Sequence, residues 1–150
     1  MFLYNLVLLV HVLSAIFALG PGLVLKFVFK NAKTITDLKN AQQIRGQVLK
    51  IIMVCGASLF LTGLILGFMN TALFKMGWYH ASLTLFLIAT AIGPIFLAKK
   101  VKKIKAILEN ATSEEIPQEY FNLSNSINML ISIQNVVYLL VLVLMVLKPF

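Results

Sequence analysis

Four long apolar stretches constrain this chain more than any other feature. They cover residues 3–29, 48–69, 78–98 and 127–147, and about 20 apolar residues are enough for a helix to cross the hydrocarbon core of a bilayer. The stretches are rich in Leu, Ala and Met and show no two-residue alternation, which favours helices over the strands of a membrane barrel. We therefore predict an all-α fold, a polytopic membrane bundle of four transmembrane helices that forms a single domain of 150 residues.

The composition supports a membrane protein. Hydrophobic residues make up 60% of the chain and charged residues 12%, with a mean hydropathy of +0.94, whereas soluble domains carry about twice that share of charge. The net charge of +8 does not indicate a nucleic-acid partner, because no basic motif with interleaved aromatic residues is present. The single cysteine, Cys55, excludes an intramolecular disulfide and a thiolate metal cluster. We expect a multi-pass protein of the cell membrane, with the lipid bilayer as its main partner.

The basic residues predict how the spans are oriented. They cluster in two places, between the first and second stretches and between the third and fourth: Lys30, Lys33, Lys39, Arg45, Lys50, and Lys99, Lys100, Lys102, Lys103, Lys105. Only Lys75 separates the second and third stretches, and the C-terminal tail has only Lys148. Because cytoplasmic loops carry the excess of Lys and Arg, both termini are predicted to be extracytoplasmic. No basic residue precedes Lys26, so the first stretch is predicted to be a retained span, not a cleaved signal.

The third helix is predicted to continue beyond the membrane. Apolar residues keep a helical spacing through residues 99–110, at Val101, Ile104, Ile107 and Leu108. Glu114, Glu115 and Pro117 then indicate a loop.

The only two histidines of the chain lie in or beside apolar stretches. An ionisable ring at membrane depth is costly and commonly marks a functional site. With the predicted orientation, His11 lies about 12 Å past Leu3 and His80 about 4–5 Å past Gly77 along their helices, so both rings are expected in the outer half of the bilayer. Neutral imidazoles on facing helices can hold a haem iron axially.

His11 and His80 are therefore candidate cofactor-binding and metal-ligating residues, with haem b as the cofactor. Two alternatives remain open. His11 is equally explained as a core histidine that hydrogen-bonds to a neighbouring backbone group or hydroxyl. For His80 the alternative is an interfacial ring, which its position directly after Trp78 and Tyr79 favours.

Small residues recur at helical spacing on two spans. They are Ala15, Ala18 and Gly22 on the first span, and Gly56, Gly63 and Gly67 on the second. We interpret them as close-packing faces that let another helix approach, although a flat ligand could use the same faces.

Polar residues recur at helical spacing on the fourth span, at Asn128, Ser132 and Asn135. They are predicted to line the bundle interior, either as interhelical hydrogen bonds or as a polar path from the cytoplasmic side. No span contains a carboxylate, which removes the usual signature of a proton-coupled pump. Because phosphate loops, nucleophile elbows and zinc-binding helix motifs are also absent, no catalytic residue is assigned.

Several short stretches occur together in a known combination: His11-Val12-Leu13-Ser14-Ala15, Gly20-Pro21-Gly22, Leu61-Thr62-Gly63-Leu64, Gly77-Trp78-Tyr79 and Leu147-Lys148-Pro149-Phe150. Nearly the whole chain resembles a family of small bacterial integral membrane proteins that is catalogued as a domain of unknown function. This resemblance implies an architecture but no chemistry.

A more distant resemblance is to the HemJ-type membrane protoporphyrinogen oxidase and the copper-resistance D group. The shared points are His11, Arg45, the pair Trp78 and His80, and the Lys-Pro-Phe ending. In the oxidase group this resemblance implies haem b bound by histidine inside the bundle, with electrons passed to a redox partner or quinone.

The chain departs from the oxidase pattern at four places. Phe17 stands where the group has tryptophan, Lys26 where it has arginine, Ser82 where it has lysine, and Asn125 or Asn128 where it has an acidic residue. The resemblance therefore implies an inherited fold rather than inherited oxidase activity.

Three functional hypotheses follow. The first is a haem-b protein for electron transfer or haem handling. The second is a non-enzymatic structural or assembly protein without a cofactor, which could act as a homo-oligomer packed through the glycine faces. The third is a small-molecule or copper permease that uses Met69, Met76 and the histidines. Whether the chain is an enzyme is left open.

Overall fold

The computed structural model describes residues 1–149, and for residue 23 the backbone alone; Phe150 of the Lys-Pro-Phe ending lies outside the described residues. The part described is helical, with no strand. Its elements are α1 (Phe2–Asn31), α2 (Ile35–Met69), the 3-10 helix η1 (Thr71–Lys75), α3 (Gly77–Ile92), the π-helical η2 (Gly93–Leu97), α4 (Ala98–Glu109) and α5 (Gln118–Leu147). Four helical paths are long and apolar enough to span a membrane. The predicted all-α, four-helix membrane fold is confirmed.

α2 begins much earlier than its apolar stretch. Thr34 and Asp37 form a capping box in which each backbone N–H donates to the other side chain, both at 3.1 Å. This arrangement satisfies two N–H groups that a helix start leaves unpaired. The segment predicted as a long basic loop is therefore mostly helix, with only residues 32–34 between α1 and α2. Hydropathy does not reveal this early start, because the first turns of α2 mix charged residues with single buried ones. The buried residues are Ile35, Leu38, Ala41 and Arg45.

The third path runs without interruption from Gly77 to Glu109. Its helical continuation beyond the membrane, which the sequence predicted to Asn110, is present as α4 and ends at Glu109. Between α3 and α4, η2 is a π-helical turn that contains Pro94. Proline supplies no backbone N–H, so the regular hydrogen-bond ladder is interrupted at this position.

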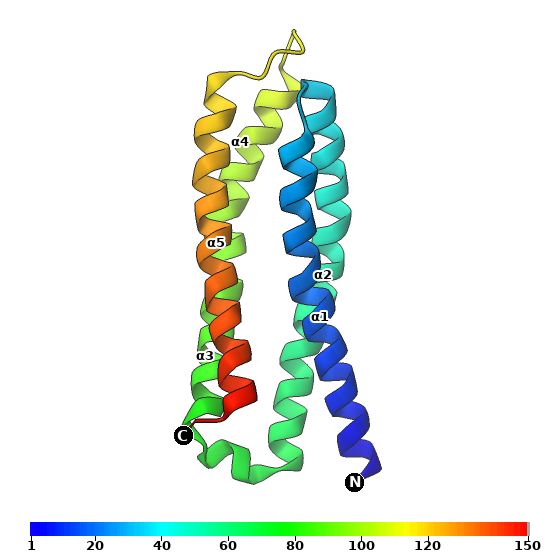
Figure 1. The fold of residues 1–150 in the computed structure, drawn as a ribbon, viewed down its shortest axis with the longest axis vertical. Helices are drawn as coiled ribbons and strands as arrows, with labels where there is room; N and C mark the ends of the chain where they lie inside the picture. The colour runs from blue at the N-terminus through cyan, green and yellow to red at the C-terminus, as the bar shows by residue number, and fades with distance from the viewer. Residues whose placement is uncertain (150) are drawn as a thin grey trace.

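The helices pair as two hairpins (Figure 1). α1 packs along α2, and α5 packs along α3 and α4, whereas contacts between the two pairs are sparse. Both chain termini and η1 lie at one end of the bundle, which we call the termini end. The two connections rich in flanking lysines, at residues 32–34 and 110–117, lie at the other end, which we call the basic end. The side of the membrane that each end faces stays a prediction.

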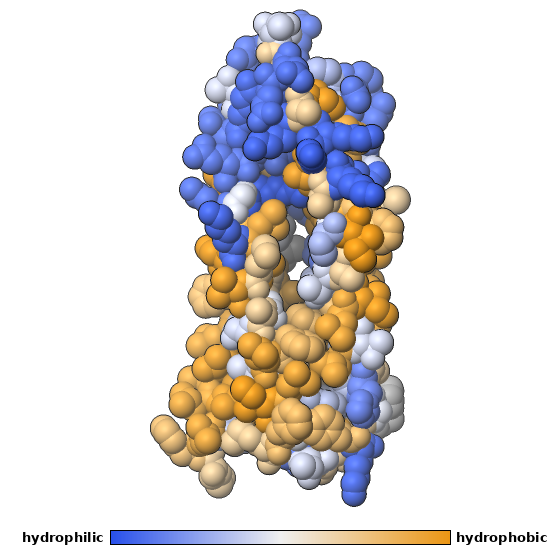
Figure 2. Space-filling model, turned by 180° about the vertical axis from the view of Figure 1, so that it is seen from behind, coloured by the Kyte–Doolittle hydropathy of each residue, from blue (hydrophilic) through white to orange (hydrophobic). Residues whose placement is uncertain are grey.

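The surface divides along the long axis of the bundle. A hydrophilic cap covers the basic end, and an apolar surface extends from it toward the termini end (Figure 2). Inside the cap, the helices share a compact core of buried residues: Ile35, Leu38, Leu97, Ile104, Leu108, Tyr120 and Ile127. The basic end is thus held together as a soluble domain is, while the rest of the bundle presents apolar side chains to lipid.

The termini end is anchored by aromatic residues. The Lys148 ammonium lies 5.8 Å from the ring centroid of Trp78, within cation–π range. Two stretches that carried the family resemblance, one at residues 77–79 and one near the C-terminus, therefore meet in space.

The loop at residues 110–117 is fastened to α2 by Glu114. Its carboxylate accepts hydrogen bonds from Thr36 Oγ1 at 2.7 Å and from Thr36 N–H at 3.1 Å. These two bonds, the side-chain one first, lower the pKa of Glu114 from its usual value. A carboxylate whose pKa is lowered in the folded state contributes stability above its unfolded pKa of about 4.3, and that contribution is lost as pH falls through the folded value.

We predict that the 110–117 loop opens on acidification. The Thr36 N–H, which donates to the Glu114 carboxylate, should be protected from hydrogen exchange at neutral pH, and its protection factor, which corrects for the pH dependence of intrinsic exchange, should fall below about pH 4.3. Glu114→Gln should lower this protection already at neutral pH, whereas the neighbouring Glu115→Gln serves as a matched control, because Glu115 is equally exposed and the bonds to Thr36 come from Glu114 alone. Equal exchange in both variants at neutral pH would contradict the fastening role of Glu114.

Candidate binding site

A large cavity separates the two hairpins. Its volume is about 640 Å³, which lies within the range of about 300–1,000 Å³ typical of small-molecule sites. Figure 2 shows the surface hollowed between the hairpins, just below the hydrophilic cap. Much of the lining is apolar, including Leu19, Leu25, Phe29, Leu49, Ile52 and Ile131.

One wall of the cavity is polar. Asn128, Ser132 and Asn135, predicted to line the bundle interior, all line this cavity from α5. Asn135 is the most deeply placed of the three by burial, and its Nδ2 is buried without a hydrogen-bond partner. The hydrogen bonds within helix α5 pair its backbone groups but not these side chains. The two amides and the hydroxyl can therefore donate to, and accept from, a molecule in the cavity.

Arg45 supplies a buried positive charge to the same cavity. Its side chain lines the cavity although the residue is only 8% exposed. The one ion pair among the described residues joins Lys105 to Glu109, at 3.8 Å, and the cavity lining contains no carboxylate. Lys26 and Lys30 of α1 add two more basic side chains to the lining. The site is thus electropositive and has no protein counter-charge in its lining.

Sequence reasoning used Arg45 for orientation and for a family resemblance, but did not recognise it as a site residue. It also missed Gln42 and Tyr120, which line the cavity with it. One signal was available: Arg45 is the only arginine among 13 basic residues. Arginine is preferred over lysine where a cation is buried or binds a planar anion.

His11 is held between α1 and α2. Its Nδ1 lies 2.9 Å from Thr62 Oγ1, and the Thr62 hydroxyl donates to the Ser58 carbonyl at 2.7 Å. A hydroxyl has one proton to donate, and Thr62 donates it to the Ser58 carbonyl. We therefore assign the His11 Nδ1–H as the donor to Thr62 Oγ1. A second polar contact, between Ser14 and Ser58 at 2.9 Å, lies one turn along the same interface. This geometry matches the core-histidine alternative for His11.

His80 has separate surroundings. It is exposed, and its Nε2 lies 2.8 Å from the Phe74 carbonyl. Its ring neighbours are Phe74 and Tyr79, with centroids at 6.5 and 5.8 Å. This position at the termini end matches the interfacial alternative.

The structure does not bring the two histidines to one cavity. His11 lines a small cavity of about 50 Å³ together with Tyr79 and Ser82, and His80 is not part of its lining. A space of that size is far below the several hundred Å³ of a small-molecule site. This arrangement of the helices therefore does not fit a haem held between His11 and His80.

The small residues serve different purposes along their faces. A Cβ at Gly63 would lie 3.3 Å from Cε1 of His11, and a Cβ at Gly67 would collide with the Tyr79 hydroxyl. These two glycines allow close approach, and Tyr79 Oη donates to the Gly63 carbonyl at 3.1 Å. Gly22 and Gly56 face open space instead. Ala18 and Gly22 line the large cavity, and Ala15 lines the small one.

We predict that Thr62→Val destabilises the α1–α2 hairpin, because the buried His11 Nδ1–H would lose its acceptor. An unsatisfied buried donor costs about 1–3 kcal/mol, so thermal or SDS unfolding in micelles should occur measurably earlier. Thr62→Ser keeps the acceptor and should behave as wild type. Thr84→Val on the exposed face of α3 is the control, and equal losses at both threonines would contradict the assigned bond.

Comparison with known proteins is consistent with this architecture. A family model described as "Predicted integral membrane protein (DUF2269)" matches residues 5–149. No curated protein and no solved structure matches the chain. Since the match covers nearly the whole bundle, with its four membrane-spanning helices, this multi-pass membrane protein belongs to the DUF2269 family of predicted integral membrane proteins.

Proposed function

We propose that this protein is a membrane-embedded binding protein that accepts an amphipathic molecule from the bilayer into the cavity between its helical hairpins. The observation that carries the proposal is the cavity of about 640 Å³ with one polar wall, located where the hydrophilic cap meets the apolar surface. Cofactor and ligand sites in helical bundles commonly lie between facing helices.

The shape of the cavity favours entry from the lipid side. At the basic end, the buried core around Ile35, Leu38, Ile104 and Leu108 closes the bundle. Contacts between the two hairpins are sparse, and the surface between them is hollowed just below the hydrophilic cap (Figure 2), which supports an opening toward the bilayer. A molecule already dissolved in the membrane reaches such a site without crossing the hydrophilic cap.

The proposal predicts that filling the cavity prevents occupancy. Gly22 lines the cavity and has open space around it, whereas Gly20, on the same helix, is exposed and is not part of the lining. In nanodiscs that contain a phosphatidylcholine with a diazirine in its acyl chain, Gly22→Trp should reduce photolabelling of α1 and α5 severalfold. Gly20→Trp should leave it unchanged, because its ring would enter lipid.

The labelling result distinguishes a ligand-binding protein from a structural protein without a ligand. If both tryptophan variants are labelled as strongly as wild type, the cavity is not a ligand site. That result would favour the alternative of a structural or assembly protein without a ligand.

Haem b is a second candidate, favoured by one observation. Thr62 fixes the ring of His11 through Nδ1 and leaves Nε2 available, as partners do for metal-ligating histidines. His11 would then hold the haem for electron transfer or haem handling with a redox partner or quinone, and His80 could join as a second ligand only by leaving its contact with the Phe74 carbonyl. Because the space beside His11 is about 50 Å³, this function requires the hairpins to part.

The haem candidate predicts a Soret band for detergent-purified protein supplied with haem, with a shift on dithionite reduction. The band should be lost in His11→Ala and retained in Asn5→Ala, a substitution at an exposed position of the same helix. A colourless wild-type protein after haem addition would rule the candidate out.

A further inference from the structure

We infer that the molecule bound between the hairpins is an acyl-chain anion, and that Arg45 is the receptor for its phosphate or carboxylate head. This inference rests on the proposed function and deepens it, because a cavity for amphipathic molecules could also select neutral ones. The juxtaposition that carries it is a buried guanidinium without a protein partner in an otherwise largely apolar cavity.

Arg45 is placed as an internal anion receptor. It is only 8% exposed, yet its side chain lines the cavity. None of the side-chain hydrogen bonds or ion pairs of the described residues uses its guanidinium. A guanidinium presents five N–H donors in a planar fork that matches carboxylate and phosphate oxygens. A buried charge is costly unless it is paired, so the cavity favours a ligand that brings the missing acceptors.

The acidic residues of the chain all lie outside the cavity lining. Asp37 caps α2, Glu114 binds Thr36, and Glu109 lies beside Lys105. The other two, Glu115 and Glu119, are exposed, and none of the five acidic residues lines the cavity. No carboxylate of the described residues is therefore available in the lining as a counter-charge for Arg45.

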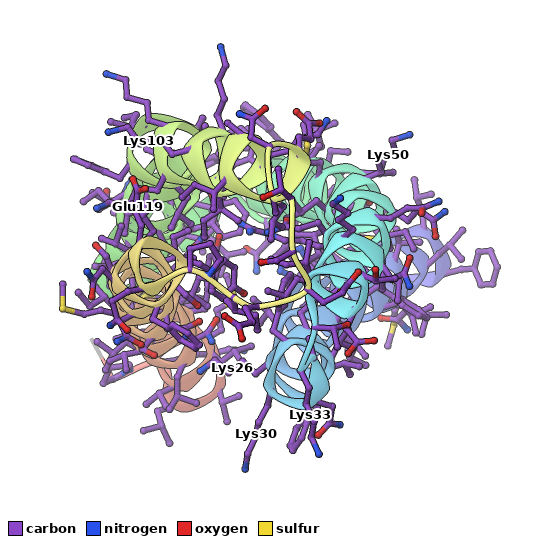
Figure 3. All side chains as sticks on the ribbon, turned by 90° about the horizontal axis from the view of Figure 1, so that it is seen from above. Lys26, Lys30, Lys33, Lys50, Lys103 and Glu119 are labelled. Atoms are coloured by element: carbon purple, nitrogen blue, oxygen red, sulfur yellow. The ribbon has the colours of Figure 1, made fainter. Side chains whose placement is uncertain are left out.

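The other basic residues of the lining add to the positive potential. Lys26 lies beside the gap between α1 and α5 when the bundle is viewed from above, whereas Lys50 and Lys103 point away from the bundle (Figure 3). Lys26 and Lys30 both line the cavity, although the Lys30 side chain points away from the bundle in Figure 3. Lys26 and Arg45 belong to the same hairpin, so positive charge lies on one side of the space in which an anionic head would sit.

The order of residues along α2 orients the ligand. Gln42, Arg45, Leu49 and Ile52 all line the cavity, and their spacing places them on one face of the helix. From Arg45 toward the termini end, this face of α2 becomes apolar, at Leu49 and Ile52. The α5 side keeps polar residues at the same depth, Asn128, Ser132 and Asn135, so the apolar path for an acyl chain lies along α2. The head would lie near Arg45 and the acyl chain would extend toward the termini end.

The depth of Arg45 agrees with a lipid-derived head. Arg45 lies ten residues into α2, about 15 Å along the helix, and the apolar stretch of α2 begins three residues later. The hollow in Figure 2 lies at the same boundary between hydrophilic and apolar surface. An acidic lipid or a fatty acid held at this boundary would place its head and its chain in the surroundings that each prefers.

The test compares matched anionic and neutral probes. Protein purified in a neutral detergent is titrated with oleate against oleyl alcohol, and with dioleoyl phosphatidic acid against dioleoylglycerol, and bound probe is counted by native mass spectrometry. A charged hydrogen-bond pair should favour each anion over its neutral partner by at least about tenfold. The oleate and phosphatidic acid arms show whether the head is a free carboxylate or a lipid phosphate.

Two substitutions assign the preference to Arg45. Arg45→Gln should abolish the preference for the anions while retaining binding of oleyl alcohol. Lys50→Gln removes an equal charge from an exposed position on the same helix and should retain the full preference. Arg45→Gln should also unfold no earlier than wild type in the absence of probe, because it removes a buried, unpaired charge.

The outcomes separate the two proposals. Equal binding of anions and neutral partners by wild type overturns the anion inference and leaves the cavity function intact. Binding of no probe by wild type overturns both. If Arg45→Gln does not fold, the wild-type preference between matched probes decides the question alone, and an anion preference that survives in a folded Arg45→Gln excludes Arg45 as the receptor.

Discussion

The bundle depends on where its helices can attract one another. In lipid, apolar side chains have no hydrophobic reason to leave the bilayer, so association relies on close packing and interhelical hydrogen bonds. Toward the termini end such bonds join His11 to Thr62 and Tyr79 to Gly63. At the basic end, water restores the hydrophobic driving force, and the core around Leu38 and Leu108 forms. Between these two regions lies the cavity.

The contacts that stabilise the bundle and the residues that line the cavity lie in different places. The contacts that hold each hairpin lie along α1–α2 and α3–α5, whereas the cavity lies between the hairpins. Arg45 is buried and Asn135 Nδ2 has no hydrogen-bond partner, and such groups cost folding free energy. Under the proposed function, occupancy of the cavity would offset that cost.

The sequence predicted the helices well and their contacts poorly. Hydropathy located all four spans, and helical spacing extended the third one through Ile104 and Leu108. It missed the early start of α2, because a capping box and single buried residues leave little hydropathy signal. It also ranked the histidines above Arg45, since depth in an apolar run was the only measure of unusual burial that a sequence offers. His11 turned out to have its acceptor in Thr62, 51 positions away.

By itself, the sequence determined the membrane class, the number of spans and the polar row on α5, because these follow from composition and from the 3.6-residue period of a helix. Only the tertiary structure decided which side chains share a space. It placed Asn128, Ser132 and Asn135 opposite a buried arginine from another hairpin, and it sent His11 and His80 to separate surroundings. The physical reason is that pairing between helices depends on side-chain shape and on hydrogen bonds between distant residues. Neither side-chain shape nor a hydrogen bond between distant residues produces a periodic pattern in the sequence.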